Sequence, residues 1–219
     1  MHSTVQNLIN ITSDVKSSLN KLQIEKIPKI IAVSKTFNID KISPLIDYGH
    51  IDYGENKVQE TEDKWTVVKE KNQNIKLHMI GKLQTNKVKF AVKLFDYIHS
   101  VDSEKLAKKI AEEQVKVGKN IKIFIQVNLG NESQKSGANT EQIKDLVSYC
   151  SHMKLNVIGF MCIPPLNVDP LPFFEQMREL NKHFNFDDLS MGMSSDYLTA
   201  AKNSATYLRL GSSIFGQRS

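Results

Sequence analysis

The chain has 219 residues, 40% of them hydrophobic and 24% charged, which is the profile of an ordinary soluble globular protein. Its longest apolar stretches, such as residues 157–163, are too short to span a bilayer, so we expect no membrane partner. The net charge is +5 and the pI is near 9.0. Basic residues alternate with acidic ones and form no stripe with aromatic residues, so we expect no nucleic-acid partner.

The N-terminus indicates the cellular compartment, and the cysteines indicate which thiol chemistry to expect. No apolar core of a signal peptide follows Met1, which predicts a cytoplasmic protein. Cys150 and Cys162 form neither a Cys-x-x-Cys motif nor the spacing of metal ligands. We therefore expect two buried thiols and no metal site.

The first predicted element is a helix, because apolar residues from Val5 to Leu22 recur at steps of three and four. Pro28 ends the linker that follows it. We expect residues 1–27 to form this helix and linker, packed on the bottom or the side of the domain that follows.

Eight apolar strands then alternate with amphipathic helical patterns. The strands are predicted near residues 29–34, 51–54, 76–80, 96–100, 121–128, 154–161, 188–192 and 206–210. Strict alternation indicates a parallel sheet, and eight units at this length favour a closed (β/α)8 barrel of the TIM type. An open Rossmann-like sheet is the alternative, but its Gly-x-Gly-x-x-Gly turn is missing after the first strand. We expect residues 1–219 to form a single α/β domain.

The first and last strands end in residues typical of a ligand site. The first runs into Ser34 and Lys35, at the face where βα loops of a barrel carry function. The last contains Arg209, one of only three arginines, and opens into Gly211 and Ser212 before a short helix. Free backbone N–H groups and hydroxyls at such a turn are suited to a phosphate. An amine facing a phosphate site suggests a phosphorylated aldehyde held as a Schiff base.

Other strands also end in polar residues. Asn56, Asp102 and Ser194 stand in such positions, although each could equally be a helix cap or a turn residue. His78 lies within the third strand, where a hydrogen-bonded core histidine is the alternative to a functional one. Together these residues predict one polar mouth.

Several motifs, in order along nearly the whole chain, resemble the pyridoxal phosphate homeostasis protein family. That family in turn resembles the barrel domain of alanine racemase without its second domain. The motifs are residues 32–36, 53–60 and 78–87, then Asn128 with Glu132, Lys135 and Gly137, then residues 189–196, and finally residues 209–218.

The resemblance implies that the chain binds pyridoxal 5′-phosphate (PLP). Lys35 matches the lysine that forms the Schiff base with the cofactor, and Arg209 matches the arginine that faces the pyridine nitrogen. Ser194, Gly211 and Ser212 match the phosphate site, with Asn56 beside it; we also include His78 among the cofactor-binding residues. The chain departs from the family at Asn203, where glycine is usual, and we expect a left-handed residue at this helix end.

Three functions remain open from the sequence. The first is a non-catalytic PLP carrier that buffers the cofactor in vitamin B6 homeostasis and serves PLP-dependent apoenzymes. The second is an amino-acid racemase with Lys35 as one base, and the third is a barrel that binds another phosphorylated metabolite. Loss of the racemase second domain favours a monomer. Of the three functions we expect the first, with no catalytic residues.

Overall fold

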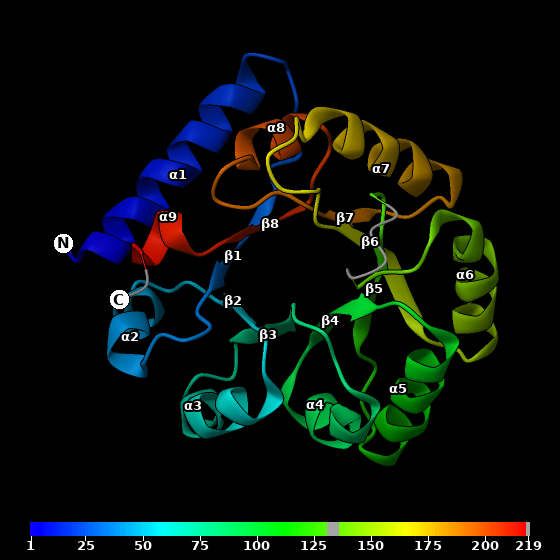
Figure 1. Cartoon of the computed structure of the whole chain (residues 1–219). Helices are drawn as coiled ribbons and strands as arrows, with labels where there is room; N and C mark the ends of the chain where they lie inside the picture. Colours follow the sequence, from blue (N-terminus) through cyan, green and yellow to red (C-terminus); the bar gives the residue numbers. More distant parts are fainter. Residues whose placement is uncertain (131–135, 218–219) are drawn as a thin grey trace.

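The computed structural model describes residues 1–130 and 136–217. Eight parallel strands close into a barrel in sequence order, with β8 paired to β1 (Figure 1). The predicted (β/α)8 barrel is thus confirmed, and the open sheet is excluded. The strands are β1 (Lys29–Val33), β2 (Asp52–Glu55), β3 (Lys76–Met79), β4 (Tyr97–Val101), β5 (Lys122–Val127), β6 (Asn156–Cys162), β7 (Asp188–Ser190) and β8 (Tyr207–Leu210).

Helices surround the barrel and cover its outer face (Figure 1). They are α2 (Ile39–Asp47), α3 (Val58–Lys71), α4 (Val88–Leu94), α5 (Glu104–Lys116), α6 (Ile143–His152), α7 (Leu171–His183), α8 (Tyr197–Lys202) and α9 (Ser212–Phe215). Their apolar faces and the outward side chains of the strands form the main hydrophobic core. None of the helices in the described ranges has the length and apolarity that crossing a membrane requires.

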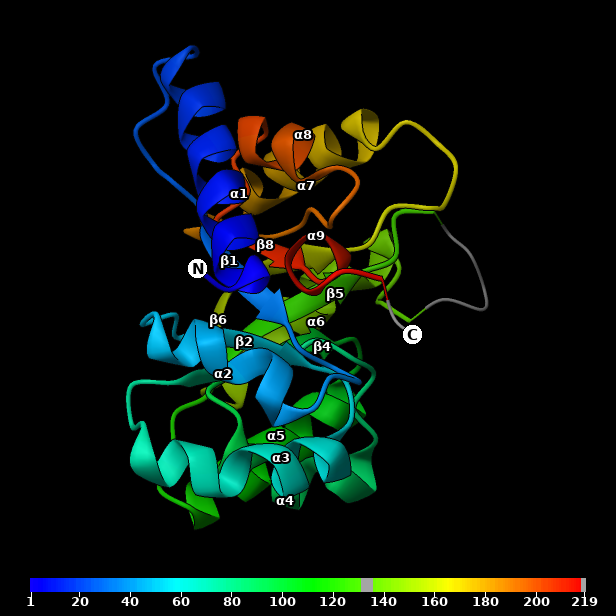
Figure 2. The same cartoon turned by 90° about the vertical axis from the view of Figure 1, so that its left-hand side faces the viewer.

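The extra N-terminal helix, α1 (Ser3–Asn20), lies on the side of the barrel, alongside α8 and α9 (Figures 1 and 2). It buries a stripe with helical spacing, formed by Val5, Leu8, Ile11, Val15 and Leu19. Its Asn7 Nδ2 donates a 3.0 Å hydrogen bond to the carbonyl of Ile214. The N-terminal helix is therefore in direct contact with the element that follows β8.

Aromatic side chains fill the barrel interior. Tyr97, Phe124 and Tyr207 form a separate cluster there with Ile31 and Met161. The ammonium groups of Lys29 and Lys122 each lie 5.3 Å from the centre of a tyrosine ring, those of Tyr207 and Tyr97 respectively. Because both lysines begin their strands, these cation–π contacts lie at the end of the barrel opposite to the strand ends where ligands bind.

Two local predictions need correction. Strand β7 ends at Ser190 rather than at residue 192, because Gly192 has φ +91°, outside the extended range. Asn203 is not left-handed: its φ is −102°, and Ser204 takes the left-handed conformation with φ +70°. The Asn203 side chain instead caps α8, donating to the carbonyl of Thr199 at 2.9 Å. Asparagine thus contributes a hydrogen bond that glycine could not provide.

Candidate functional site

A cavity of about 540 Å³ opens where β1, β7 and β8 end. This volume lies in the ordinary range for a small-molecule site. The cavity brings together five of the seven predicted site residues. These are Lys35, Ser194, Arg209, Gly211 and Ser212, and apolar side chains such as Val33, Phe37, Ile80 and Ile163 complete the lining. We call this the mouth cavity.

Hydrogen bonds with residues of β2 and α3 fix the loop that carries Lys35. The hydroxyl of Ser34 donates to Glu55 Oε1 at 2.7 Å, and the N–H of Thr36 donates to Glu60 Oε1 at 2.7 Å. Lys64 Nζ donates to the carbonyl of Ser34 at 2.9 Å. Lys35 is therefore held on both sides by residues of β2 and α3, which we call the lysine clamp: Glu55, Glu60 and Lys64.

Glu55 is the centre of the lysine clamp. Its side chain is fully buried, and Oε1 also accepts from Trp65 Nε1 at 2.9 Å and lies 3.0 Å from Lys64 Nζ. A buried carboxylate needs donors around it, and here three donors meet Oε1, whereas Oε2 is buried without a hydrogen-bond partner among the described atoms. Sequence reasoning missed this role. The signal available in the sequence was the spacing of four between Glu60 and Lys64 on a predicted helix, which indicates an ion pair.

The opposite wall is formed by the β7–α8 loop and α9. Ser194 Oγ lies 3.0 Å from Ser213 Oγ and accepts from the N–H of Ser213 at 3.2 Å. The serines thus connect the loop after β7 to the helix after β8. Phe37 stacks on Phe215 with ring centroids 5.0 Å apart, so the same helix also contacts the segment after Lys35.

Arg209 presents a buried cation to the mouth cavity. Arg209 is 4% exposed, and burial lowers the pKa of its guanidinium. One terminal nitrogen donates to Ser190 Oγ and the other to the carbonyl of Cys162, both at 2.8 Å. Within residues 1–130 and 136–217 no carboxylate lies within 4.0 Å of it. A buried cation without a neighbouring anion favours a ligand that brings a hydrogen-bond acceptor.

Two predicted site residues do not line the mouth cavity. The backbone of Asn56 packs against Gly81, where an added Cβ would come within 2.5 Å of the Asn56 carbonyl oxygen. Asn56 Oδ1 is buried without a hydrogen-bond partner among the described atoms. His78 lies deeper in the barrel, and its ring nitrogens contact Asp52 and His99, each at 3.0 Å. The motif residues Glu132, Lys135 and Arg218 fall outside the described ranges.

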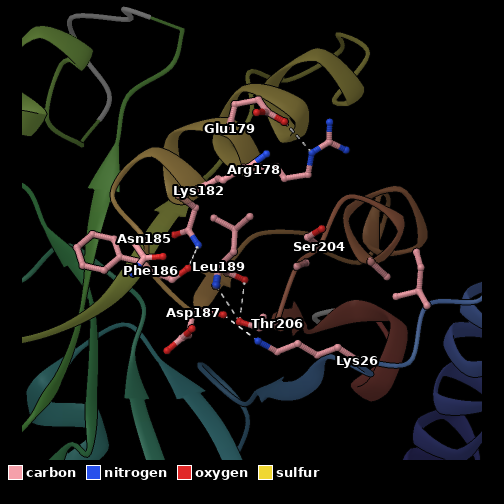
Figure 3. Close-up of a pocket in the computed structure, with 14 residues that line it drawn as sticks. Lys26, Arg178, Glu179, Lys182, Asn185, Phe186, Asp187, Leu189, Ser204 and Thr206 are labelled. Carbon is pink, nitrogen blue, oxygen red and sulfur yellow. Dashed lines mark hydrogen bonds and ion pairs between the residues drawn. The ribbon is translucent and has the colours of Figure 1, made fainter.

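Another cavity, of about 510 Å³, lies at the opposite end of the barrel, where β7 and β8 begin (Figure 3). Several of its polar groups already make protein contacts: Lys26 Nζ donates to the carbonyl of Asp187 at 2.8 Å, and Thr206 Oγ1 accepts from the N–H of Leu189 at 2.8 Å (Figure 3). Because ligands of such barrels bind at the carboxyl ends of the strands, we place the functional site in the mouth cavity.

Comparison with known proteins identifies the family of the chain. Residues 7–219 match the family described as alanine racemase, N-terminal domain. The pyridoxal phosphate homeostasis protein of Vibrio cholerae is 35% identical, covering 100% of this chain and 98% of the relative. That of Aquifex aeolicus is 36% identical, covering 89% of each.

Solved structures agree with the fold. PipY of Synechococcus elongatus, solved with PLP bound, superposes with a TM-score of 0.81 at 31% identity, covering 92% of this chain and 100% of PipY. Alanine racemase of Clostridium difficile has the same barrel at 14% identity, with a TM-score of 0.73, over 99% of this chain and 57% of the racemase. The chain therefore belongs to the alanine racemase N-terminal domain family and, within it, to the pyridoxal phosphate homeostasis proteins.

Proposed function

We propose that residues 1–219 act as one PLP-binding barrel that carries and buffers the cofactor in vitamin B6 homeostasis without strong catalysis. The observation that carries the proposal is the mouth cavity, where clamped Lys35 and buried Arg209 share one lining with Ser194, Gly211 and Ser212. The names of the relatives and the PLP bound in PipY support the same ligand.

The five predicted residues in the lining have proposed roles toward PLP. Lys35 would hold the cofactor as a reversible Schiff base with its aldehyde, with loss of the aldehyde oxygen as water. Ser194, Ser212 and the backbone at Gly211 would hold the phosphate with charge-assisted hydrogen bonds. Arg209 would donate to the pyridine nitrogen, and because a guanidinium stays protonated that nitrogen would stay unprotonated. When bound, PLP supplies an electron sink, which this arrangement weakens.

The two residues outside the cavity lining are assigned differently. We expect Asn56 to contact the ligand only if its side chain turns toward the cavity. We assign His78 an indirect role, because both of its ring nitrogens already have partners in the barrel interior.

The expectation of weak catalysis rests on the number of bases among the described residues that line the mouth cavity. Racemisation needs a base on each face of the reacting carbon, and Lys35 supplies one. Positioned general bases contribute about 10²–10⁴-fold each, so a site with one base should be slow. Recipients of PLP would be PLP-dependent apoenzymes. A cytoplasmic location is supported by Cys150 and Cys162, which are both free thiols.

The proposal is tested by titrating the protein with three ligands and following protein fluorescence and visible absorption. PLP should bind with a new visible band, and pyridoxine 5′-phosphate, which lacks the aldehyde, should bind without one. Pyridoxal should bind at least about a hundredfold more weakly than PLP, since two or more charge-assisted hydrogen bonds are lost. Equal affinity for PLP and pyridoxal would contradict the assignment of the phosphate site.

A chiral assay with PLP and a panel of L-amino acids tests the racemase alternative. We expect no turnover in the enzymatic range of about 1–10³ per second. Turnover in that range that is lost in Lys35→Ala would establish a racemase instead of a carrier.

A further inference from the structure

A continuous series of polar contacts crosses the barrel interior, which is otherwise apolar and aromatic. Arg209 donates to Ser190 Oγ at 2.8 Å, and Ser190 Oγ lies 2.9 Å from His99 Nδ1. His99 Nε2 lies 3.0 Å from His78 Nδ1, and His78 Nε2 lies 3.0 Å from Asp52 Oδ1. We call these five residues the interior chain. They come from β2, β3, β4, β7 and β8, and all are buried.

The interior chain joins opposite ends of the barrel. Asp52 is the first residue of β2, at the end away from the mouth cavity, whereas Arg209 lines that cavity near the end of β8. Aromatic rings enclose the two histidines. His78 stacks on Tyr97 with ring centroids 4.2 Å apart, and His99 stacks on Phe124 at 4.3 Å. The rings therefore have little freedom to turn.

With both histidines neutral, the chemistry of the two ends fixes the direction of every hydrogen bond between them. A guanidinium can only donate, and a carboxylate can only accept. Ser190 accepts from Arg209, so its hydroxyl proton is available for His99 Nδ1. His99 Nε2–H then donates to His78 Nδ1, and His78 Nε2–H donates to Asp52. Both histidines are neutral in this arrangement, with the proton on Nε2.

The charge states agree with this direction. Burial lowers the pKa of His78, and it lowers the pKa of His99 well below its usual value, with the charge of Arg209 adding to the effect. Burial alone would raise the pKa of Asp52, but the hydrogen bond with His78 helps to bring it below its ordinary value. The reverse direction would require a protonated Asp52 or a charged His78, and the lowered pKa of each group disfavours that state.

We propose that Ser190, His99, His78 and Asp52 are positioning residues that orient Arg209 toward the ring nitrogen of PLP. This inference rests on the proposed function. Ser190 and the Cys162 carbonyl each engage one terminal nitrogen of the guanidinium, so its plane is fixed and its remaining N–H groups are available to the mouth cavity. The carboxylate of Asp52 balances the buried cation through the polarised hydrogen bonds between them.

The first test concerns the interior chain alone and needs no ligand. Nitrogen-15 NMR of the histidine side chains at pH 7.5 should show His78 and His99 as neutral rings protonated on Nε2. Spectra of His78→Phe and His99→Phe assign the signals. A proton on Nδ1 of His99, or a charged ring at either position, would overturn the direction deduced above.

The second test measures binding of PLP against its 1-deaza analogue, in which carbon replaces the ring nitrogen. Wild-type protein should prefer PLP by about tenfold or more, the contribution of one hydrogen bond from a charged donor. Ser190→Ala and His99→Phe should bring this ratio close to one. Ser100→Ala removes a neighbouring buried hydroxyl that has no hydrogen-bond partner among the described residues, and it should leave the ratio unchanged.

The preference ratio separates positioning from general loosening, because a loosened barrel weakens both ligands alike. An unchanged ratio in Ser190→Ala and His99→Phe would therefore overturn the inference. Ser190→Thr retains the hydroxyl and should retain the preference. If wild-type protein binds neither ligand, the proposed function is wrong, and the histidine NMR signals alone decide whether the interior chain exists.

Discussion

At the residue scale, Glu55 and Arg209 show how buried charges are used in this barrel. Glu55 accepts from Ser34, Trp65 and Lys64, and so fixes the loop of Lys35 from within the fold. Arg209 is held by Ser190 and by a backbone carbonyl, with donors left for a ligand. One buried charge therefore fixes the loop of Lys35, and we propose that the other is available to the ligand.

Replacing Glu55 with leucine tests the lysine clamp. Glu55→Leu leaves the buried Ser34 hydroxyl and the Trp65 Nε1–H without their acceptor and removes one of the acceptors around Lys64 Nζ. We expect it to lower the free energy of unfolding by about 3–5 kcal/mol. Glu62→Leu on α3, the helix that carries Glu60 and Lys64, removes an exposed carboxylate and should change stability by less than about 0.5 kcal/mol. Urea unfolding followed by circular dichroism gives both values. A cost below about 1 kcal/mol for Glu55→Leu would contradict the role of the clamp.

Buried histidines predict a loss of stability in mild acid. Burial lowers the pKa of His50, His78 and His99, so these groups bind protons less readily in the folded than in the unfolded protein. The unfolded state then binds more protons as the pH falls below about 6.5, the ordinary histidine pKa, and stability falls with it. Above that pH the contribution of these histidines is constant.

The measurement is urea unfolding at pH 7.5, 6.5 and 5.5. Each histidine contributes a slope of at most about 1.4 kcal/mol per pH unit. His183→Gln, which alters an exposed histidine on α7, should keep the wild-type slope. A free energy of unfolding that stays level or rises between pH 7.5 and 5.5 would show that the buried histidines do not behave as neutral groups.

At the scale of elements, the strand ends could be predicted from sequence and the contacts between them could not. Lys35 and Arg209 stand out because each lies at or near the end of an apolar run. The clamp depends on the β1–β2 register, in which Val33 lies opposite Gly54, and this brings Ser34 beside Glu55. The interior chain depends on closure of the barrel, which no local pattern encodes. The roles of the site residues toward PLP stay predictions.

Gly192, in the loop after β7, can be compared with Gly49 to test how closely this loop packs. Gly192 has φ +91°, and an added Cβ would lie 2.6 Å from the Cβ of Ala200. Gly49 has φ +94° with nothing within 4 Å of such a Cβ. Gly49→Ala should cost about 1–2 kcal/mol of stability from backbone strain alone. Gly192→Ala should cost about 1–3 kcal/mol more from overpacking, and it should weaken PLP binding because Ser194 moves.

Unfolding and PLP titration of both alanine variants provide the comparison. Equal losses of stability would show that contact with Ala200 does not matter at this loop. Unchanged PLP affinity in Gly192→Ala would show that the position of Ser194 does not control the phosphate site.

At the scale of the whole molecule, α1 occupies the outside of the barrel beside α8 and α9 (Figure 2). The chain aligns with 57% of the alanine racemase whose barrel it shares. We expect residues 1–219 to form a monomer. Light scattering after size-exclusion chromatography should give about 24.9 kDa with and without PLP. A mass of twice that value at micromolar concentration would contradict the expectation.

The central claim is that Lys35 attaches PLP in the mouth cavity. Borohydride reduction of the PLP-loaded protein, followed by peptide mass mapping, tests it most directly. We predict one reduced adduct, on the peptide that contains Lys35. The control variant Lys82→Ala, which removes an exposed lysine after β3, should retain this adduct. The folded Lys35→Ala variant should lack it. An adduct of equal stoichiometry on another lysine of Lys35→Ala, or none in the wild type, would contradict the account.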